Sequence, residues 1–366
     1  MAKNLIFCFD GTSNSPRDAV QDISLRGEVE DDSITNVLKL HLLCGGDLQN
    51  RPLDGTQHSL YYRGIGTYGS GLRRTINRIL APERQDVASI LRTACHDLKR
   101  LYQPGDQVFL FGFSRGAALA RRFAAIVRAR TGVTPPPGTH LIRFVGVFDT
   151  VASIDQPNLD RERKPKTRVL FEHHTISPDI REALHLVSLD ERRIPFQPTL
   201  MNRDHRVTEV WFPGVHSDVG GGFHLDGLSD IALDFMLRDL RRRRTGLVLL
   251  GPDALDYDWL RTEDGVQLIA PDDMAIAPNP GAPAHPITGL PALLRHTFLA
   301  DRRAHVIEHD RVVTGALPLV HHAVRERACM LPGYHPPALE RVEYRLIGPN
   351  GSVTIGSGPE SLSAAR

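Results

Sequence analysis

The sequence is short of features that would assign it to a broad class at once. It has only four cysteines in 366 residues, and none of them forms a Cys-x-x-Cys pair. This pattern favours free thiols in a reducing compartment over a disulfide framework. There is no excess of charge of either sign, with 44 basic against 43 acidic residues. The net charge therefore gives no indication of a nucleic-acid partner or of bulk attraction to an anionic membrane.

The amino-terminal region also lacks a long apolar run. Its first apolar stretch covers only residues 5–9 and ends at Asp10, which is too short for a signal peptide or a membrane span. We therefore expect a soluble chain that is cytoplasmic as synthesised and carries no Sec signal. The sequence shows no internal repeat, no heptad array and no dedicated metal-binding motif. We expect no cofactor and no metal.

The most informative stretch is an apolar run at residues 107–111 that passes into Gly112-Phe113-Ser114-Arg115-Gly116 and then into an alanine-rich segment. This order indicates a strand, a sharp turn and a helix. In that context Gly-x-Ser-x-Gly is typical of a nucleophile elbow, in which a strained turn lifts the serine above the sheet edge. Ser114 is therefore the candidate nucleophile.

Further apolar runs indicate strands at residues 5–9, 59–63, 141–148 and 207–212, with helical spacing between several of them. A strand, a helix and a strand in succession imply a right-handed parallel crossover. The predicted fold class is α/β: an α/β-hydrolase-like, mostly parallel central sheet flanked by helices, with lid-like insertions. The polar segment 154–174 is the main candidate for such an insertion.

The length allows one or two domains, and we predict one. A single elaborated hydrolase domain is expected over residues 1–348, with its core at about 4–245 and insertions and carboxyl-terminal elements at 246–348. The small, polar residues 349–366 are expected to form a flexible tail. Five local elements are also expected: a helix capped by Ser229, mixed character at 181–189, a short helix at 291–299, an edge strand at 342–347, and a solvated arginine run at the helix end, 241–244.

A serine nucleophile needs an imidazole to take its proton and a carboxylate to orient that imidazole. After a nucleophile elbow the expected order is Ser, then Asp or Glu, then His. Asp149 follows the predicted strand after Ser114, and His216 follows a later strand. Order favours Asp149 as the acid, but Asp218 lies close to His216 in sequence and remains an alternative.

The tetrahedral oxyanion of acyl transfer needs hydrogen-bond donors. The backbone N–H of Arg115 is the expected first donor, and the turn after the first strand offers Gly11 or Thr12 as the second. Asp10 either orders this loop by accepting hydrogen bonds from the backbone or from His216, or caps the turn.

Four motifs occur in a fixed order: Phe9-Asp10-Gly11-Thr12-Ser13-Asn14, Gly112-Phe113-Ser114-Arg115-Gly116-Ala117, Gly146-Val147-Phe148-Asp149-Thr150-Val151, and Trp211-Phe212-Pro213-Gly214-Val215-His216-Ser217-Asp218-Val219-Gly220-Gly221-Gly222. With Leu189-Asp190-Glu191-Arg192-Arg193 and Thr35-Asn36-Val37, they resemble the DUF2235 hydrolases, the family that contains type VI secretion phospholipase effectors. The resemblance covers most of residues 4–240 and, more loosely, 324–327.

The resemblance carries the three triad roles onto Ser114, Asp149 and His216. It implies an ester substrate, a phospholipid for the effector members, and hence peripheral membrane contact. For an effector it also implies delivery by type VI secretion, with secretion-system and immunity proteins as partners.

Alternative functions rest on single motifs. Asp10-Gly11-Thr12 is similar to part of the haloacid dehalogenase phosphatase signature, but Cys8 stands where that signature has its nucleophilic aspartate. A catalytically inactive binding module on a hydrolase scaffold is the other alternative, against which the complete Ser/Asp/His set argues.

Alternative sites are weaker. The Gly-x-Gly-x-x-Gly match at 64–69 would suit a dinucleotide only if a strand ended near Asp86, where the spacing instead predicts a helix. His216 with Asp10, Asp149 and Asp218 would make an oxygen-rich metal site. Three further histidines are expected on the surface or in loops: His224, His321 and His322.

Overall fold

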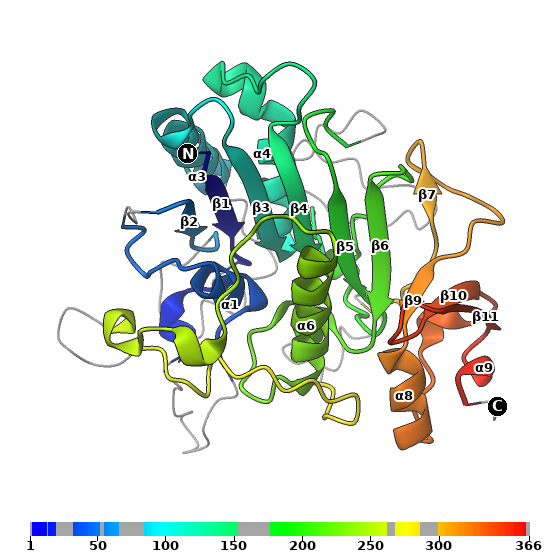
Figure 1. The fold of residues 1–366 in the computed structure, drawn as a ribbon. Helices are drawn as coiled ribbons and strands as arrows, with labels where there is room; N and C mark the ends of the chain where they lie inside the picture. Colours follow the sequence, from blue (N-terminus) through cyan, green and yellow to red (C-terminus); the bar gives the residue numbers. More distant parts are fainter. Residues whose placement is uncertain are drawn as a thin grey trace.

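The computed structural model describes residues 2–12, 14–19, 32–51, 55–65, 84–152, 176–261, 268–285 and 299–363. Its central feature is a nine-stranded sheet (Figure 1). The strands, in chain order, are β1 (Asn4–Phe9), β2 (Gln57–Tyr62), β3 (Gln107–Phe113), β4 (Ile142–Phe148), β5 (Ala183–Ser188), β6 (Val207–Phe212), β9 (Leu319–His321), β10 (Glu343–Ile347) and β11 (Val353–Ser357). A separate small hairpin is formed by β7 (Ile307–Glu308) and β8 (Arg311–Val312).

The order of strands across the sheet is β11-β10-β9-β6-β5-β4-β3-β1-β2. All neighbouring strands run parallel except β10 and β11, which pair antiparallel at one edge. This is the mostly parallel sheet that the sequence predicts for an α/β fold. Because the strands are parallel, the loops that follow their carboxyl ends meet at one edge, where ligands bind in open α/β sheets.

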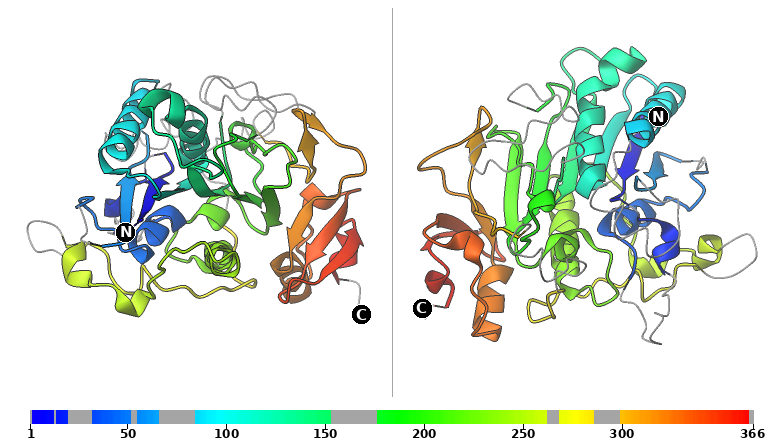
Figure 2. Two further views of the ribbon diagram at one scale, coloured as in Figure 1. Left: turned by 45° about the horizontal axis from the view of Figure 1, so that its top comes forward. Right: turned by 180° about the vertical axis from the view of Figure 1, so that it is seen from behind.

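Helices cover both faces of the sheet (Figure 2). The longer helices are α1 (Asn36–Leu43), α3 (Arg84–Leu101), α4 (Ser114–Thr131), α6 (Gly227–Arg242) and α8 (Ala323–Met330); the short ones are α5 (His216–Gly220) and α9 (Glu360–Ser363). Alternate side chains of β1 enter the two cores: Ile6 and Cys8 pack with α1 and α6, whereas Leu5, Phe7 and Phe9 pack with α3 and α4. The run at residues 5–9 is continuously apolar because both of its faces are buried.

A third core joins the carboxyl-terminal third to the sheet. Trp211 of β6 and Val320 of β9 pack there with Val324 of α8 and Leu362 of α9. The predicted flexible tail is wrong over the described residues 349–363, because β11 pairs with β10 along its whole length and Leu362 is buried. The division into one domain stays a prediction.

Several local expectations need correction. The segment expected at 342–347 contains β10, which is not an edge strand because β11 pairs with it. The mixed segment 181–189 contains β5, which lies inside the sheet. Helix α6 begins two residues before Ser229, whose hydroxyl donates to the carbonyl of Asp226. The expected insertion at 154–174 and most of the expected helix at 291–299 lie outside the described residues.

Candidate active site

Ser114 lies where β3 turns sharply into α4. Its backbone has φ of +57°, in the left-handed region that a non-glycine residue rarely adopts. The glycines on either side allow the turn: a Cβ on Gly112 would lie 2.7 Å from the Cα of Ala117, and one on Gly116 would lie 2.2 Å from the carbonyl oxygen of Phe9. The motif therefore encodes a strained turn packed directly against the end of β1.

Asp149 occupies the equivalent position on the neighbouring strand. Phe113 of β3 pairs with Phe148 of β4, so Ser114 and Asp149 are the next residues of two adjacent parallel strands. Asp149 also has positive φ, of +38°. The N–H of Val151 donates to the carbonyl oxygen of Ser114 at 3.2 Å, which ties the two turns together.

His216 begins α5 and completes the group. Its Nδ1 lies 2.6 Å from Oδ2 of Asp149, and its ring packs against Phe113, the residue before Ser114, at a centroid distance of 4.6 Å. The edge of Phe196 closes the other side at 5.0 Å. The Nε2 atom is buried and has no hydrogen-bond partner in the part of the chain that the structure describes. The imidazole thus has one nitrogen bound to a carboxylate and the other unused.

The Asp149 carboxylate is buried and fully engaged. Besides His216 it accepts from the N–H of Ser188 at 3.0 Å and from both terminal nitrogens of Arg302, at 2.7 Å and 2.9 Å. Burial alone raises the pKa of Asp149, but the Arg302 charge and the His216 hydrogen bond outweigh it and hold that pKa well below its usual range. Asp149 is therefore ionised at neutral pH.

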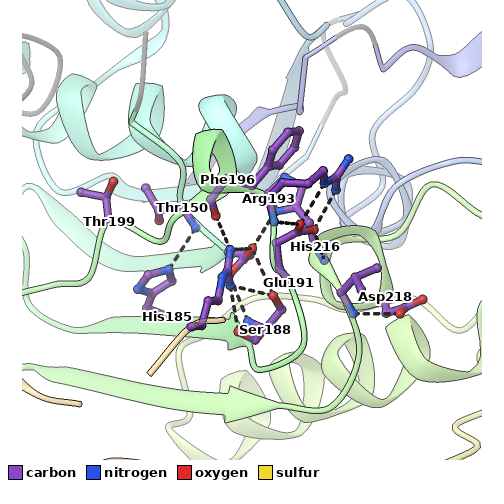
Figure 3. Close-up of polar contacts among 12 residues, drawn as sticks. Thr150, His185, Ser188, Glu191, Arg193, Phe196, Thr199, His216 and Asp218 are labelled. Atoms are coloured by element: carbon purple, nitrogen blue, oxygen red, sulfur yellow. Dashed lines mark hydrogen bonds and ion pairs between the residues drawn. The ribbon is translucent and has the colours of Figure 1, made fainter. Parts of the chain in front are cut away.

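His216 is held in its neutral form. Burial lowers the pKa of His216, and the hydrogen bond and charge of Asp149 only partly oppose that effect. Its backbone N–H donates at 3.3 Å to Glu191, whose carboxylate is paired with Arg193 at 2.7 Å and 2.8 Å. Figure 3 shows Ser188, Glu191, Arg193 and His216 gathered together. A neutral imidazole on a fixed carboxylate is the form that accepts a proton.

Asp218 does not contact the His216 ring. Its Oδ2 accepts from the N–H of Val215 at 2.8 Å, and its Oδ1 lies 2.6 Å from Nδ1 of His285. In Figure 3 it lies to one side of His216. Asp218 thus shapes the turn that carries His216, while Asp149 holds the imidazole.

The loop after β1 lies against the serine turn. A Cβ on Gly11 would lie 2.8 Å from the ring of Phe113, so the two loops touch. Asp10 is buried and accepts from the N–H of Gly11 at 2.7 Å, from the hydroxyl of Thr35 at 2.8 Å and from that of Tyr61. Burial raises the pKa of Asp10 to about 6, although each of these hydrogen bonds lowers it. Asp10 orders this loop through its backbone and its neighbours, without His216.

Comparison with known proteins assigns the chain to a family. A family model described as "T6SS, Phospholipase effector Tle1-like, catalytic domain" matches residues 3–141 and 135–239, well over half of the chain. The chain belongs to this family. An uncharacterized protein of Saccharomyces cerevisiae is 31% identical over 168 residues, which are 43% of this chain and 22% of the yeast protein.

Two solved structures are similar in part. An uncharacterized protein from Pseudomonas aeruginosa aligns with a TM-score of 0.45 at 18% identity, over 76% of this chain and 49% of that one. The Tle1 effector, solved bound to the VgrG spike of the type 6 secretion system, aligns with a TM-score of 0.36 at 23% identity, over 61% of this chain and 51% of that one. The chain thus spans about half of each structure and about a fifth of the yeast relative.

Within this Tle1-like domain, the structure gives little support to the alternative metal and dinucleotide sites. Among the described residues no group of three or more His, Cys, Asp or Glu side chains is arranged to hold a metal. Asp86 lies in α3 and not at the end of a strand, and residues 66–69 of the glycine motif lie outside the described part. No helix in the described ranges combines the length and apolar character of a membrane span.

The other histidines and the arginine run were also expected at exposed positions, and the structure confirms this only in part. His224 is exposed as expected, but His321 is buried in β9 and stacks on Phe212 at 4.6 Å. The arginine run is not wholly solvated, because Arg243 pairs with Asp239 and donates to Thr208 at 3.1 Å.

Sequence reasoning misses two residues around Asp149 and His216. Arg302 lies in a stretch without helix or strand, so no period or motif marks it. His185 accepts from the N–H of Thr150 at 3.1 Å through Nε2 and contacts Glu209 at 2.8 Å through Nδ1. It supports the backbone just after Asp149. His185 could have been noticed from the sequence because it lies within a run of apolar residues, where a buried polar side chain requires a partner.

Proposed function

We propose that the chain is a serine hydrolase of carboxylic esters that works through Ser114, Asp149 and His216. The observation that carries the proposal is the 2.6 Å contact between His216 and Asp149, with the unpartnered Nε2 buried beside the strained turn of Ser114. Ser114, Asp149 and His216 follow the carboxyl ends of β3, β4 and β6, which supports these three roles. This constellation performs acyl transfer on several unrelated folds.

In the proposed reaction His216 Nε2 takes the proton of Ser114 as the hydroxyl attacks the ester carbonyl. Asp149 keeps the imidazole in the tautomer with the proton on Nδ1 and stabilises the imidazolium that forms. His216 then returns its proton to the leaving alcohol, and an acyl group remains on Ser114. Water attacks the acyl-enzyme by the same sequence and releases the acid.

For the oxyanion we propose the N–H of Arg115, in the first turn of α4, together with Thr12. The N–H of Gly11 already donates to Asp10, which favours Thr12 of the two loop candidates. The Thr12 hydroxyl is buried and unpartnered in the described part of the chain. A buried hydroxyl without a partner is costly unless a ligand satisfies it.

For the substrate we propose a phospholipid, because the family is described by that activity. The same description supports delivery by type VI secretion. We further propose secretion-system and immunity proteins as partners, as the resemblance to effector members implies. The phosphatase alternative has no comparable support, since the oxygens of Asp10 are taken up by Gly11, Thr35 and Tyr61.

A fluorophosphonate probe tests the proposal. The purified chain should form one adduct, located on Ser114 by peptide mass spectrometry, and should hydrolyse short p-nitrophenyl esters. A panel of phospholipids and lysophospholipids labelled at one acyl position or the other then identifies the bond that is cleaved. A folded protein without an adduct and without turnover on the whole panel would leave the inactive binding module as the better reading.

The Thr12 assignment predicts a separable effect. Thr12→Val keeps the shape of the side chain and removes the hydroxyl, so kcat should fall by about 10² while KM changes little, the size of one lost oxyanion donor. Thr12→Ser retains the hydroxyl and should keep most of the activity. Steady-state kinetics on a p-nitrophenyl ester measures both variants, and equal activity of Thr12→Val and wild type would remove the side chain from the site.

A further inference from the structure

The two terminal nitrogens of Arg302 bind both oxygens of the proposed acid, Asp149. The arginine side chain is fully buried, and its two terminal nitrogens reach the two oxygens of Asp149 separately, at 2.7 Å and 2.9 Å. The nitrogen bound to Oδ1 also donates to the carbonyl and the hydroxyl of Ser188, at 2.8 Å and 2.6 Å. The other nitrogen also donates to the carbonyl of Phe196. The guanidinium is therefore fixed from three sides.

These contacts fix the plane of the carboxylate. A bidentate arginine holds both oxygens of a carboxylate in one orientation. The oxygen that faces His216 is Oδ2, and it is one of the two that Arg302 binds. Turning Oδ2 away from His216 would break both guanidinium contacts and the hydrogen bond from the N–H of Ser188. The position of His216 Nδ1 is thus determined in part by a residue far along the chain.

The charges around His216 are balanced in pairs. The charged groups that shift the pKa of His216 most are Asp149, Glu191 and Arg193. Glu191 is paired with Arg193, and Asp149 is paired with Arg302. The group is therefore neutral while the imidazole is neutral, and a proton on His216 adds an uncompensated charge in a buried site. An Asp149 without Arg302 would attract that proton more strongly.

Stability alone explains this arrangement poorly. Burying two charges costs free energy that their mutual attraction seldom exceeds, and apolar residues of similar volume often serve as well. The contacts instead suit control of orientation and charge at His216.

We infer that Arg302 is a positioning residue: it fixes the Asp149 carboxylate that orients His216, and its charge favours the neutral, proton-accepting form of the His216 imidazole. The inference rests on the proposed serine hydrolase function, and it deepens that function by adding a residue from the carboxyl-terminal third. Arg302 acts through Asp149 and does not itself contact the reacting atoms.

The test compares Arg302→Gln and Arg302→Lys with wild type and with Arg143→Gln. Arg143 is a suitable control because it is also a largely buried arginine paired with a carboxylate, Glu182 at 2.8 Å, but it lies near the start of β4, away from His216. NMR of the chain labelled at histidine ¹³Cε1 follows His216, which a His216→Gln variant assigns. Kinetics on a p-nitrophenyl ester follows the acidic limb of kcat/KM.

In Arg302→Gln we expect the titration of His216 and the acidic limb to move upward by about one pH unit, the usual effect of one nearby charge. The kcat should fall roughly ten- to a hundredfold, part of what general acid–base catalysis contributes. Arg302→Lys keeps the charge without the bidentate geometry, so its titration should stay near that of wild type while kcat falls about tenfold. Arg143→Gln should lower the melting temperature and leave the pH profile in place.

A folded Arg302→Gln with an unmoved titration and acidic limb overturns the inference, even if its activity is reduced, because a merely structural role predicts that result. A fully active Arg302→Lys also overturns it. If Arg302→Gln does not fold, measurements on Arg302→Lys and on wild type decide whether the inference holds. A wild-type His216 whose pKa is at or above the usual histidine value of about 6.5 contradicts the inference. Absence of both probe adduct and turnover in wild type counts against the hydrolase itself, whereas the NMR titration reports on Arg302 without any turnover.

Discussion

Ser114→Ala will lower kcat on an ester substrate by about 10⁶, since removal of the nucleophile from a serine triad leaves only binding and oxyanion stabilisation. His216→Ala should lose a similar factor, and the double variant should be scarcely worse than either single one. That non-additivity is expected because the serine and the imidazole act as one unit. Assays with p-nitrophenyl esters that use long incubation times for the slow variants measure kcat over this range.

The matched control for this prediction is Ser229→Ala. Ser229 is a buried serine in α6 whose hydroxyl donates to the carbonyl of Asp226. This variant should keep wild-type kcat. A Ser114→Ala protein with more than about a tenth of wild-type turnover would place the nucleophile elsewhere, given that the expected loss is several orders of magnitude larger.

The second large effect is expected for Asp149→Asn, which should lower kcat by about 10⁴ with little change in KM. An asparagine amide at this position no longer imposes the tautomer with the proton on Nδ1 of His216, so Nε2 is not reliably free to accept a proton. The change also leaves Arg302 buried without its anion. The loss should therefore come with reduced thermal stability, which a melting curve measures separately from kcat.

Asp218→Asn is the comparison that decides between the two acids. Asp218 touches the N–H of Val215 and the ring of His285, and neither contact reaches the His216 ring. We expect kcat within about tenfold of wild type, far from the loss expected for a triad acid. Normal turnover in Asp149→Asn together with a collapse in Asp218→Asn would reverse the assignment.

The sequence predicts the parts of this fold that depend on local pattern. The strand before Ser114 is apolar on both faces and ends in a Gly-x-Ser-x-Gly turn, so residue type, burial and backbone strain all indicate the same structure. The α/β class and the sheet edge that carries Asp149 and His216 follow from the same alternation of strands and helices.

The sequence could not provide the geometry that decides whether Asp149 or Asp218 orients His216. Both residues follow predicted strands, and sequence position alone does not fix the distance from either carboxylate to the His216 ring. What separates them is the pairing of Phe113 with Phe148, which sets Asp149 beside Ser114, and that register depends on the assembled sheet.

The carboxyl-terminal third was predicted least well because its structure depends on distant contacts. β11 is a short strand whose side chains are mostly exposed, and it forms by pairing with β10. His321 reads as a polar loop residue but is buried by stacking on Phe212. Arg302 has no secondary structure of its own, and its role is defined only by the carboxylate that it meets.

The location of Arg302 bears on where a minimal version of this protein can be cut. The region that matches the family model ends at residue 239 and holds Ser114, Asp149 and His216. A fragment trimmed to that boundary would contain all three proposed triad residues, but it would lack the guanidinium that pairs with the Asp149 anion. Breaking a buried pair in this way costs about 3–5 kcal/mol, a large share of the stability of an ordinary domain. Any smaller version must therefore keep the stretch that runs through Arg302.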